Sequence, residues 1–205
     1  MMTIRILILL SALIGLQNCM AQEITVGLEL VKDHKGDSLL DGMKTWRLYV
    51  YTPDSNYRVT AVFGSNEHPL EINSSKPFWQ HQMGDAVASQ VNARMAAEVR
   101  GLVYDSWVTV GMENNKSKGN LYFLESPQQP WTVEFEDGRN MEISDSIGGS
   151  WFALPDQPNT QARGSRVLIG QFTTAGKISG RINCQIRTGQ EGSLGENYFD
   201  LEIRR

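Results

Sequence analysis

Apolar and polar residues alternate with a period of two along most of the chain from Ile24 onward. In the segment Thr45 to Thr52, Trp46, Leu48 and Val50 fall on one side of an extended backbone, and the residues between them fall on the other. This alternation is typical of strands that bury one face. It predicts about a dozen short strands. They are 24–31, 45–52, 57–63, 70–72, 106–112, 120–125, 131–135, 141–143, 150–154, 166–173, 177–187 and 198–203.

Turn-forming residues separate these segments. Pro53 to Asn56 joins the second and third predicted strands with residues that favour tight turns, so we expect those two strands to form a hairpin. Strands do not alternate with helices along the chain, which argues against a parallel α/β sheet. The pattern therefore predicts an all-β fold, a two-sheet antiparallel β-sandwich of jelly-roll type, with a barrel as the alternative.

One segment has a helical period instead. Between Asp85 and Arg100, four apolar residues recur every four positions, as on one face of a helix. Asp85 could cap the start of such a helix, and Gly101 could end it. The sequence predicts one short helix near 85–100, or else an irregular loop along a sheet edge.

Residues 1–21 have the pattern of a cleaved secretory signal peptide. Arg5 precedes an apolar stretch that is too short to cross a membrane as a helix, and small residues follow it. We therefore expect a secreted, extracellular protein whose single domain occupies residues 22–205. Cys19 offers an alternative, a lipid anchor, although Asn18 before it fits a lipid-attachment motif poorly.

The charge balance is mildly acidic, with a formal net charge of −4 and no cluster of lysines or arginines. Nucleic-acid binding requires clustered cations, so this class of partner is not expected. Cys184 lies between two isoleucines in a predicted strand, which indicates a buried, unreactive thiol. We expect no disulfide, no cofactor and no membrane span.

Aromatic and glycine residues recur in a recognisable order. The segments are Thr45-Trp46-Arg47-Leu48-Tyr49, Tyr104-Asp105-Ser106-Trp107-Val108-Thr109-Val110-Gly111 and Gly148-Gly149-Ser150-Trp151-Phe152. Together they resemble an uncharacterised β-rich module of secreted proteins from marine bacteria and algae. The resemblance covers roughly Gly27 to Glu202 and implies an extracellular, matrix-associated or adhesive role. It supplies no catalytic residues.

No catalytic or metal-binding motif stands out. The three histidines, His34, His68 and His81, form no paired metal-binding motif, and no nucleophile elbow surrounds Ser150. Carboxylates that could form a glycosidase pair are plentiful, but spacing along the chain cannot place two of them across a cleft. They are Glu134, Glu136, Asp137, Glu142, Asp145 and Asp156.

Two tryptophans in loop-like surroundings are the best candidates for a binding site. Trp79 is followed by Gln80, and Trp131 follows two glutamines. Exposed rings beside amides suit sugars, because a ring stacks on the apolar face of a sugar while amides orient its hydroxyls. We therefore expect a non-enzymatic module that binds extracellular carbohydrate or matrix through Trp79, Gln80 and Trp131. The alternatives are a glycan hydrolase or lyase on a jelly-roll scaffold and a self-assembling adhesin or matrix component.

Overall fold

The computed structural model describes residues 23–189 and 193–204. Strands dominate these residues, so the prediction of a mainly β protein is confirmed. The strands are β1 (Thr25–Asp33), β2 (Lys44–Tyr51), β3 (Arg58–Gly64), β4 (Leu70–Ser74), β5 (Trp107–Val108), β6 (Tyr122–Leu124), β7 (Met141–Ile143), β8 (Gly149–Phe152), β9 (Arg166–Thr174), β10 (Ile178–Arg187) and β11 (Glu196–Arg204).

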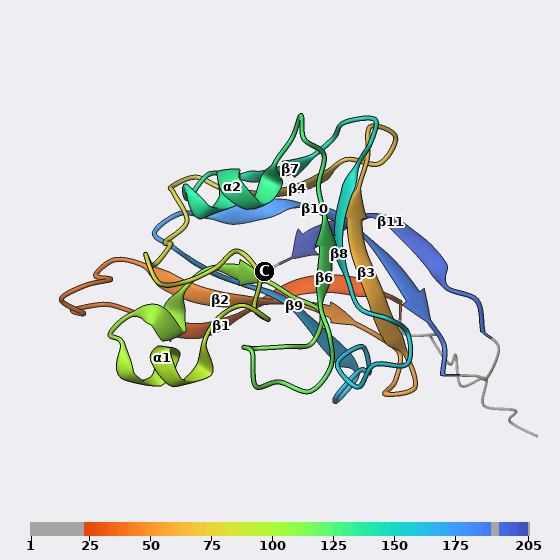
Figure 1. The fold of residues 1–205 in the computed structure, drawn as a ribbon, viewed down its shortest axis with the longest axis horizontal. Coiled ribbons are helices and arrows are strands. Elements are labelled where there is room, and N and C mark those ends of the chain that lie inside the picture. Colours follow the sequence, from red (N-terminus) through yellow and green to blue (C-terminus); the bar gives the residue numbers. More distant parts are fainter. Residues whose placement is uncertain (1–22, 190–192, 205) are drawn as a thin grey trace, which may run out of the picture.

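The strands form a single curled sheet in the order β5-β9-β2-β1-β11-β10-β3-β8-β6, with β4 and β7 attached beside β10 (Figure 1). Strand β11 joins the two halves, because it pairs with β10 on one side and with β1 on the other. The β1–β11 pair is parallel, and the other strand pairs are antiparallel. The sheet is therefore mixed and curls like half a barrel, and the predicted two-sheet antiparallel sandwich is not confirmed.

The two halves of the sheet enclose one main core. Leu48 and Val50 from one half belong to the same buried cluster as Val62 from the other half. Aromatic rings fill the centre: Trp131 lies 5.5 Å from Trp151, and Phe135 lies 5.9 Å from Phe172 between ring centroids. The alternating apolar positions thus point inward, as their period predicts.

The thiol of Cys184 lies within this core in β10 and is fully buried. Burial alone raises its pKa well above the usual thiol value, because no nearby charge favours the thiolate. The burial of Cys184, as predicted from its two isoleucine neighbours, is confirmed.

The predicted hairpin between the second and third strands is wrong. Strand β2 pairs with β1 and β9, while β3 pairs with β10 and β8, so the turn at 53–56 carries the chain from one half of the sheet to the other. After this turn, Val59 N–H donates to the carbonyl of Thr160 rather than to β2. Residues that favour a turn fix a change of direction but do not select the partner strand.

Helical structure is short. Helix α1 covers only Ala93–Glu98, and Asn92 caps it by accepting hydrogen bonds from Arg94 N–H and Met95 N–H. Asp85 therefore caps no helix, and Val87 lies in a bridge beside Val108. Gly101, with φ of 88°, precedes a 3-10 turn, η1 (Leu102–Tyr104). The predicted helix over 85–100 is thus confined to its second half.

A second helix, α2 (Trp131–Glu136), replaces the strand predicted at 131–135. Trp131 and Phe135 are four residues apart and both are buried, so the helix turns these two rings toward the core. Residues four apart, such as Trp131 and Phe135, lie on the same face both of a strand and of a helix. The burial of both rings is satisfied here by the helix.

Residues 1–21, including the predicted leader and Cys19, lie outside the described residues. Within the described residues, no helix has both the length and the apolar character needed to span a membrane.

Candidate functional site

The curled sheet splits beside its central strand. Strand β1 pairs with β11 only at Val26 and Gly27, and it then continues to Asp33 without a partner on that side. Strand β10 pairs with β11 only from Arg181 onward, so Ile178 to Gly180 also face the split. Backbone groups on both edges are left free of sheet hydrogen bonds there, within the described chain.

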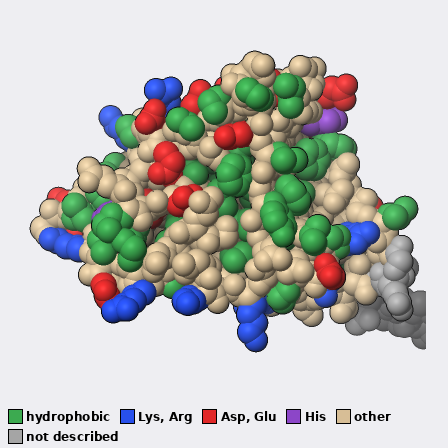
Figure 2. Space-filling view, in the orientation of Figure 1, with side chains coloured by type: hydrophobic (Ala, Val, Ile, Leu, Met, Phe, Trp, Pro, Cys, Tyr) green, Lys and Arg blue, Asp and Glu red, His purple; other side chains and the backbone are tan. Residues whose placement is uncertain are grey.

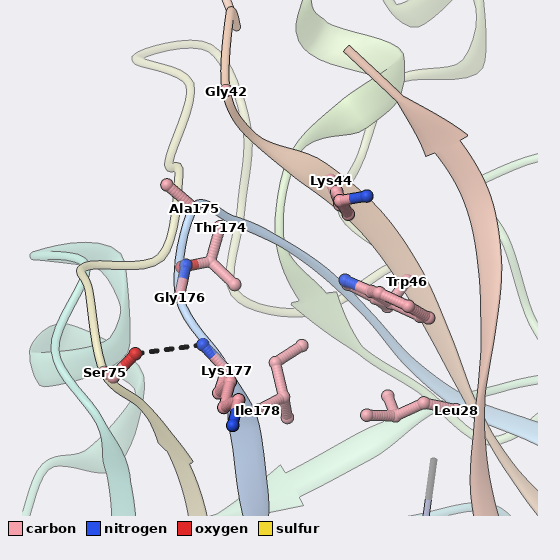
Figure 3. Close-up of a pocket in the computed structure, with 10 residues that line it drawn as sticks. All are labelled: Leu28, Gly42, Lys44, Trp46, Ser75, Thr174, Ala175, Gly176, Lys177 and Ile178. Carbon is pink, nitrogen blue, oxygen red and sulfur yellow. Dashed lines mark hydrogen bonds between the residues drawn. The ribbon is translucent and has the colours of Figure 1, made fainter. Parts of the chain in front are cut away.

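A pocket of about 520 Å³ lies in this split, and we call it the split pocket. Figure 3 shows Leu28 of β1 and Ile178 of β10 pointing toward each other, with Trp46 of β2 beside them. Lys44 and Lys177 lie on opposite walls. The remaining lining residues are Gly42, Ser75, Thr174, Ala175 and Gly176.

The turn between β9 and β10 forms one end of the split pocket and is held by hydroxyl groups. The Thr174 hydroxyl donates to the carbonyls of Lys76 and Pro77 and accepts from Gly176 N–H. Ser75 Oγ accepts from Lys177 N–H, the bond drawn in Figure 3. A Cβ at residue 176 would come within 2.4 Å of Ser74 Oγ, so only glycine fits there. This end of the pocket is therefore preorganised.

A second pocket, of about 480 Å³, adjoins the first, and we call it the Trp79 pocket. Ala175 lines both pockets, so the β9–β10 turn separates them. The other residues that line the Trp79 pocket are Met43, Lys76, Pro77, Phe78, Trp79, Gln80, Glu136, Asp137 and Gly138.

The Trp79 pocket lies where the segment 76–80 meets the end of α2. Phe78 N–H donates to the carbonyl of Gly138, and the Gln80 side-chain amide donates to the carbonyl of Phe135. Gly138 has φ of 75°, a conformation that favours glycine, and a Cβ there would meet Phe78 O at 2.7 Å. Gln80 is thus held beside the end of α2, and Trp79 is held by β9, because Trp79 N–H donates to the carbonyl of Thr173.

The structure therefore brings Trp79 and Gln80 together in one pocket. Both side chains are part-buried, and each contains a buried polar atom, Trp79 Nε1 and Gln80 Oε1, with no hydrogen-bond partner among the described residues. Leaving such atoms unpaired costs about 1–3 kcal/mol each. The two unpaired atoms are covered by protein, and what lines the pocket is an aromatic side chain beside an amide side chain, a pair suited to a ligand with apolar faces and hydroxyl groups.

Trp131 does not join them. Its ring is only 1% exposed, and its Nε1 donates to the carbonyl of Leu124 at 3.0 Å. The expectation of an exposed ring at this position is wrong, because Trp131 begins α2 and packs into the core against Trp151. It offers no open face to a sugar.

Three carboxylates, those of Asp85, Asp105 and Glu136, lie close to one another, and Glu136 lines the Trp79 pocket. Asp105 is fully buried and accepts hydrogen bonds from His81 N–H and Asp85 N–H, which organise the loop 81–85. Burial raises the pKa of Asp105 to about 7, against the opposing effect of these hydrogen bonds. Desolvation, followed by repulsion from Asp105 and Asp85, raises the pKa of Glu136 to about 7.

The other candidates lie apart. His34 is buried and bonded through Nε2 to Thr45, His68 stacks on Phe199, and His81 lies beside Trp79. Within residues 23–189 and 193–204, no three histidine, cysteine or acidic side chains are grouped to hold a metal ion. Of the six carboxylates singled out from the sequence, Glu136 and Asp137 line the Trp79 pocket.

The sequence did not indicate the split pocket. Trp46 lies on the predicted buried face of its strand, and it also forms part of the pocket wall although only 9% of its surface is exposed. Lys44 and Lys177 are isolated cations in the sequence, and they line one pocket only because the curl of the sheet brings the start of β2 and the β9–β10 turn to the same split. A site formed by strands from two halves of a sheet leaves no local motif.

Comparison with known proteins finds no matching family, no similar curated protein and no similar solved structure. The resemblance to a secreted β-rich module stays a prediction, and function has to be inferred from the geometry of the two pockets.

Proposed function

We propose that the protein is a secreted, non-enzymatic module that binds extracellular carbohydrate along the groove formed by the Trp79 pocket and the split pocket. The observation that carries this proposal is the Trp79 pocket itself, where an aromatic side chain and an amide held by the Phe135 carbonyl lie side by side. The fold of this module would be sandwich-like, because the two halves of the curled sheet would take the positions of the two sheets of a sandwich.

The chemistry of the groove suits a sugar chain. Sugars present apolar C–H faces and polar hydroxyl edges, and the groove offers the rings of Trp79 and Trp46 together with amide, hydroxyl and backbone groups. The two pockets share Ala175, so neighbouring units of one oligosaccharide could occupy both. The rigid β9–β10 turn between them would lower the entropic cost of binding.

The direct test is the substitution Trp79→Ala, measured by retention on a glycan array and then by calorimetry on the glycans that bind. We expect a loss in affinity of about tenfold or more, which corresponds to at least about 1.4 kcal/mol. Tyr122→Ala is the matched control, because Tyr122 is also an aromatic residue, 44% exposed, but lies outside both pockets. Equal loss in the two variants, or no glycan binding at all, would rule out the proposed site.

A glycan hydrolase is the second candidate, since Glu136 lines the Trp79 pocket and has the raised pKa of a general acid. Its companion Asp137 is adjacent in the chain and is paired with Arg139. Consecutive residues at the end of one short helix do not provide two carboxylates on opposite sides of a scissile bond. Release of new reducing ends by the protein, abolished in Glu136→Gln, would favour the enzyme over the binding module.

A further inference from the structure

The split pocket has a positive lining. Among the residues that the structure describes, Lys44 and Lys177 are the only charged ones that line it, and no aspartate or glutamate does. Lys44 forms an ion pair with Asp33, whereas Lys177 has no carboxylate within 4.0 Å among the described residues. Lys76, at the neighbouring pocket, is likewise without an ion pair in the described chain. The split pocket therefore offers unneutralised positive charge beside an apolar floor.

The Trp79 pocket has the opposite character. Two carboxylates, Glu136 and Asp137, and one lysine, Lys76, form part of its wall, and Asp105 and Asp85 lie close enough to Glu136 to raise its pKa. An anionic group placed there would meet like charge, which is unfavourable. The two pockets thus differ in charge: carboxylates line only the Trp79 pocket, where they outnumber its one lysine, whereas the split pocket is lined by two lysines.

We propose that the split pocket binds an acidic sugar unit, one that carries a carboxylate or a sulfate, while a neutral neighbouring unit lies against Trp79. This inference rests on the proposed carbohydrate-binding function and names its ligand class. An acidic sugar has both groups that the pocket can bind. Its apolar ring face can pack on Leu28, Ile178 and Trp46, and its negative group can pair with Lys177.

The polar groups around Lys177 support the same placement. Its backbone N–H is bonded to Ser75 Oγ and Gly176 N–H is bonded to Thr174, so the turn holds the start of β10 in a fixed position. The free backbone edges of β1 and β10 border the same pocket and can pair with hydroxyl groups of the sugar. Lysine acts here as a mobile point charge, which suits a carboxylate or a sulfate without selecting between them.

The test compares three oligosaccharides of equal length, one neutral, one containing uronic acid and one sulfated, by calorimetry at low and at physiological salt. We expect the acidic ligands to bind about tenfold more tightly than the neutral one, with the difference shrinking as salt screens the charges. The uronate and sulfate arms identify which anionic group is preferred. Lys177→Gln should lower the affinity for the acidic ligands to about that for the neutral ligand.

Lys116→Gln is the matched control, because Lys116 is an exposed lysine that lines neither pocket. If neutral and acidic ligands bind equally, or if Lys177→Gln and Lys116→Gln behave alike, the acidic subsite is refuted and the carbohydrate-binding function survives. If none of the three ligands binds and the wider glycan array is also negative, the proposed function fails as well. Inorganic sulfate and free glucuronate are run alongside, and binding of these alone without any oligosaccharide would also refute a subsite for a sugar chain.

Discussion

Asp105 shows how a single buried group can organise the surroundings of a site. Its carboxylate accepts hydrogen bonds from the loop 81–85, and a Cβ at Gly84 would lie 1.8 Å from its Oδ2. The loop in turn follows Trp79 and Gln80 directly, so Asp105 helps to position the predicted binding residues from behind. This is a structural role, and it explains why burial is tolerated despite its electrostatic cost.

The raised pKa of Asp105 predicts a specific pH dependence of stability. The folded protein holds this proton up to about pH 7, whereas the unfolded chain releases it near the usual pKa of 3.8. The stabilisation is therefore fully present below pH 3.8 and is lost as pH rises to about 7, a contribution of about 2–4 kcal/mol. Asp105→Asn should flatten this decline when unfolding free energy is measured by urea titration between pH 4 and 8.

Comparing the wild-type protein with Asp105→Asn removes the contribution of groups that do not interact with Asp105. The pKa of buried His34 is lowered by burial, so His34 acts in the opposite direction and costs stability as pH falls below 6.5. That contribution is present in both proteins and cancels in the difference. Asp105→Asn also removes one cause of the raised pKa of Glu136. A wild-type decline that Asp105→Asn leaves unchanged would show that Asp105 is ionised in the fold.

Strands and helices were predictable from the sequence where the residues of the segment itself determine its secondary structure. Strands such as β2, β9 and β10 follow from alternation, because the buried face of each strand is recorded in its own sequence. Helix α2 was missed because Trp131 and Phe135 fit both periods, and the core selects between them. The hairpin was wrong because pairing depends on strands more than 100 residues away, such as β9 with β2.

The candidate site was likewise predictable only where its residues are neighbours in the sequence. Trp79 and Gln80 lie side by side in the sequence, so their composition was visible before folding. Trp131 has the same composition around it but is buried, because a ring beside glutamines can turn inward when a helix begins there. Lys44 and Lys177 could not be paired from the sequence, since only the curled sheet brings their strands to one pocket.

Strand β6 is the element on which the self-assembly alternative depends. It lies at one end of the sheet order, and its three side chains, Tyr122, Phe123 and Leu124, are 44%, 36% and 62% exposed. Figure 2 shows apolar side chains gathered over this part of the molecule. An exposed apolar edge strand is a template for pairing with a second copy of the chain.

If β6 pairs between copies, light scattering should show a mass that rises with protein concentration, and Leu124→Lys should return it to that of a monomer. A charge on an edge strand opposes edge-to-edge pairing without touching the core. Val133→Lys provides a control, since Val133 is 59% exposed on α2 but lies off the sheet edge. A wild-type protein that stays monomeric at high concentration would exclude this alternative.

At the scale of the whole molecule, the groove is a consequence of how the two halves of the sheet are joined. Strand β11 bridges them only over part of its neighbours' length, and the split pocket occupies the remainder. The half-barrel curl then sets the β9–β10 turn between the split pocket and the end of α2. A fold that closed into two separate antiparallel sheets would not produce this opening.

The five tryptophans report on this arrangement at once, through their indole N–H signals in an NMR titration with the best-binding oligosaccharide. Trp46 and Trp79 line the groove, whereas Trp107, Trp131 and Trp151 are buried and line neither pocket, so they serve as internal controls. Saturable shifts confined to the signals of Trp46 and Trp79 are the predicted result. A bound glycan that moves neither of these two signals would contradict the proposed groove.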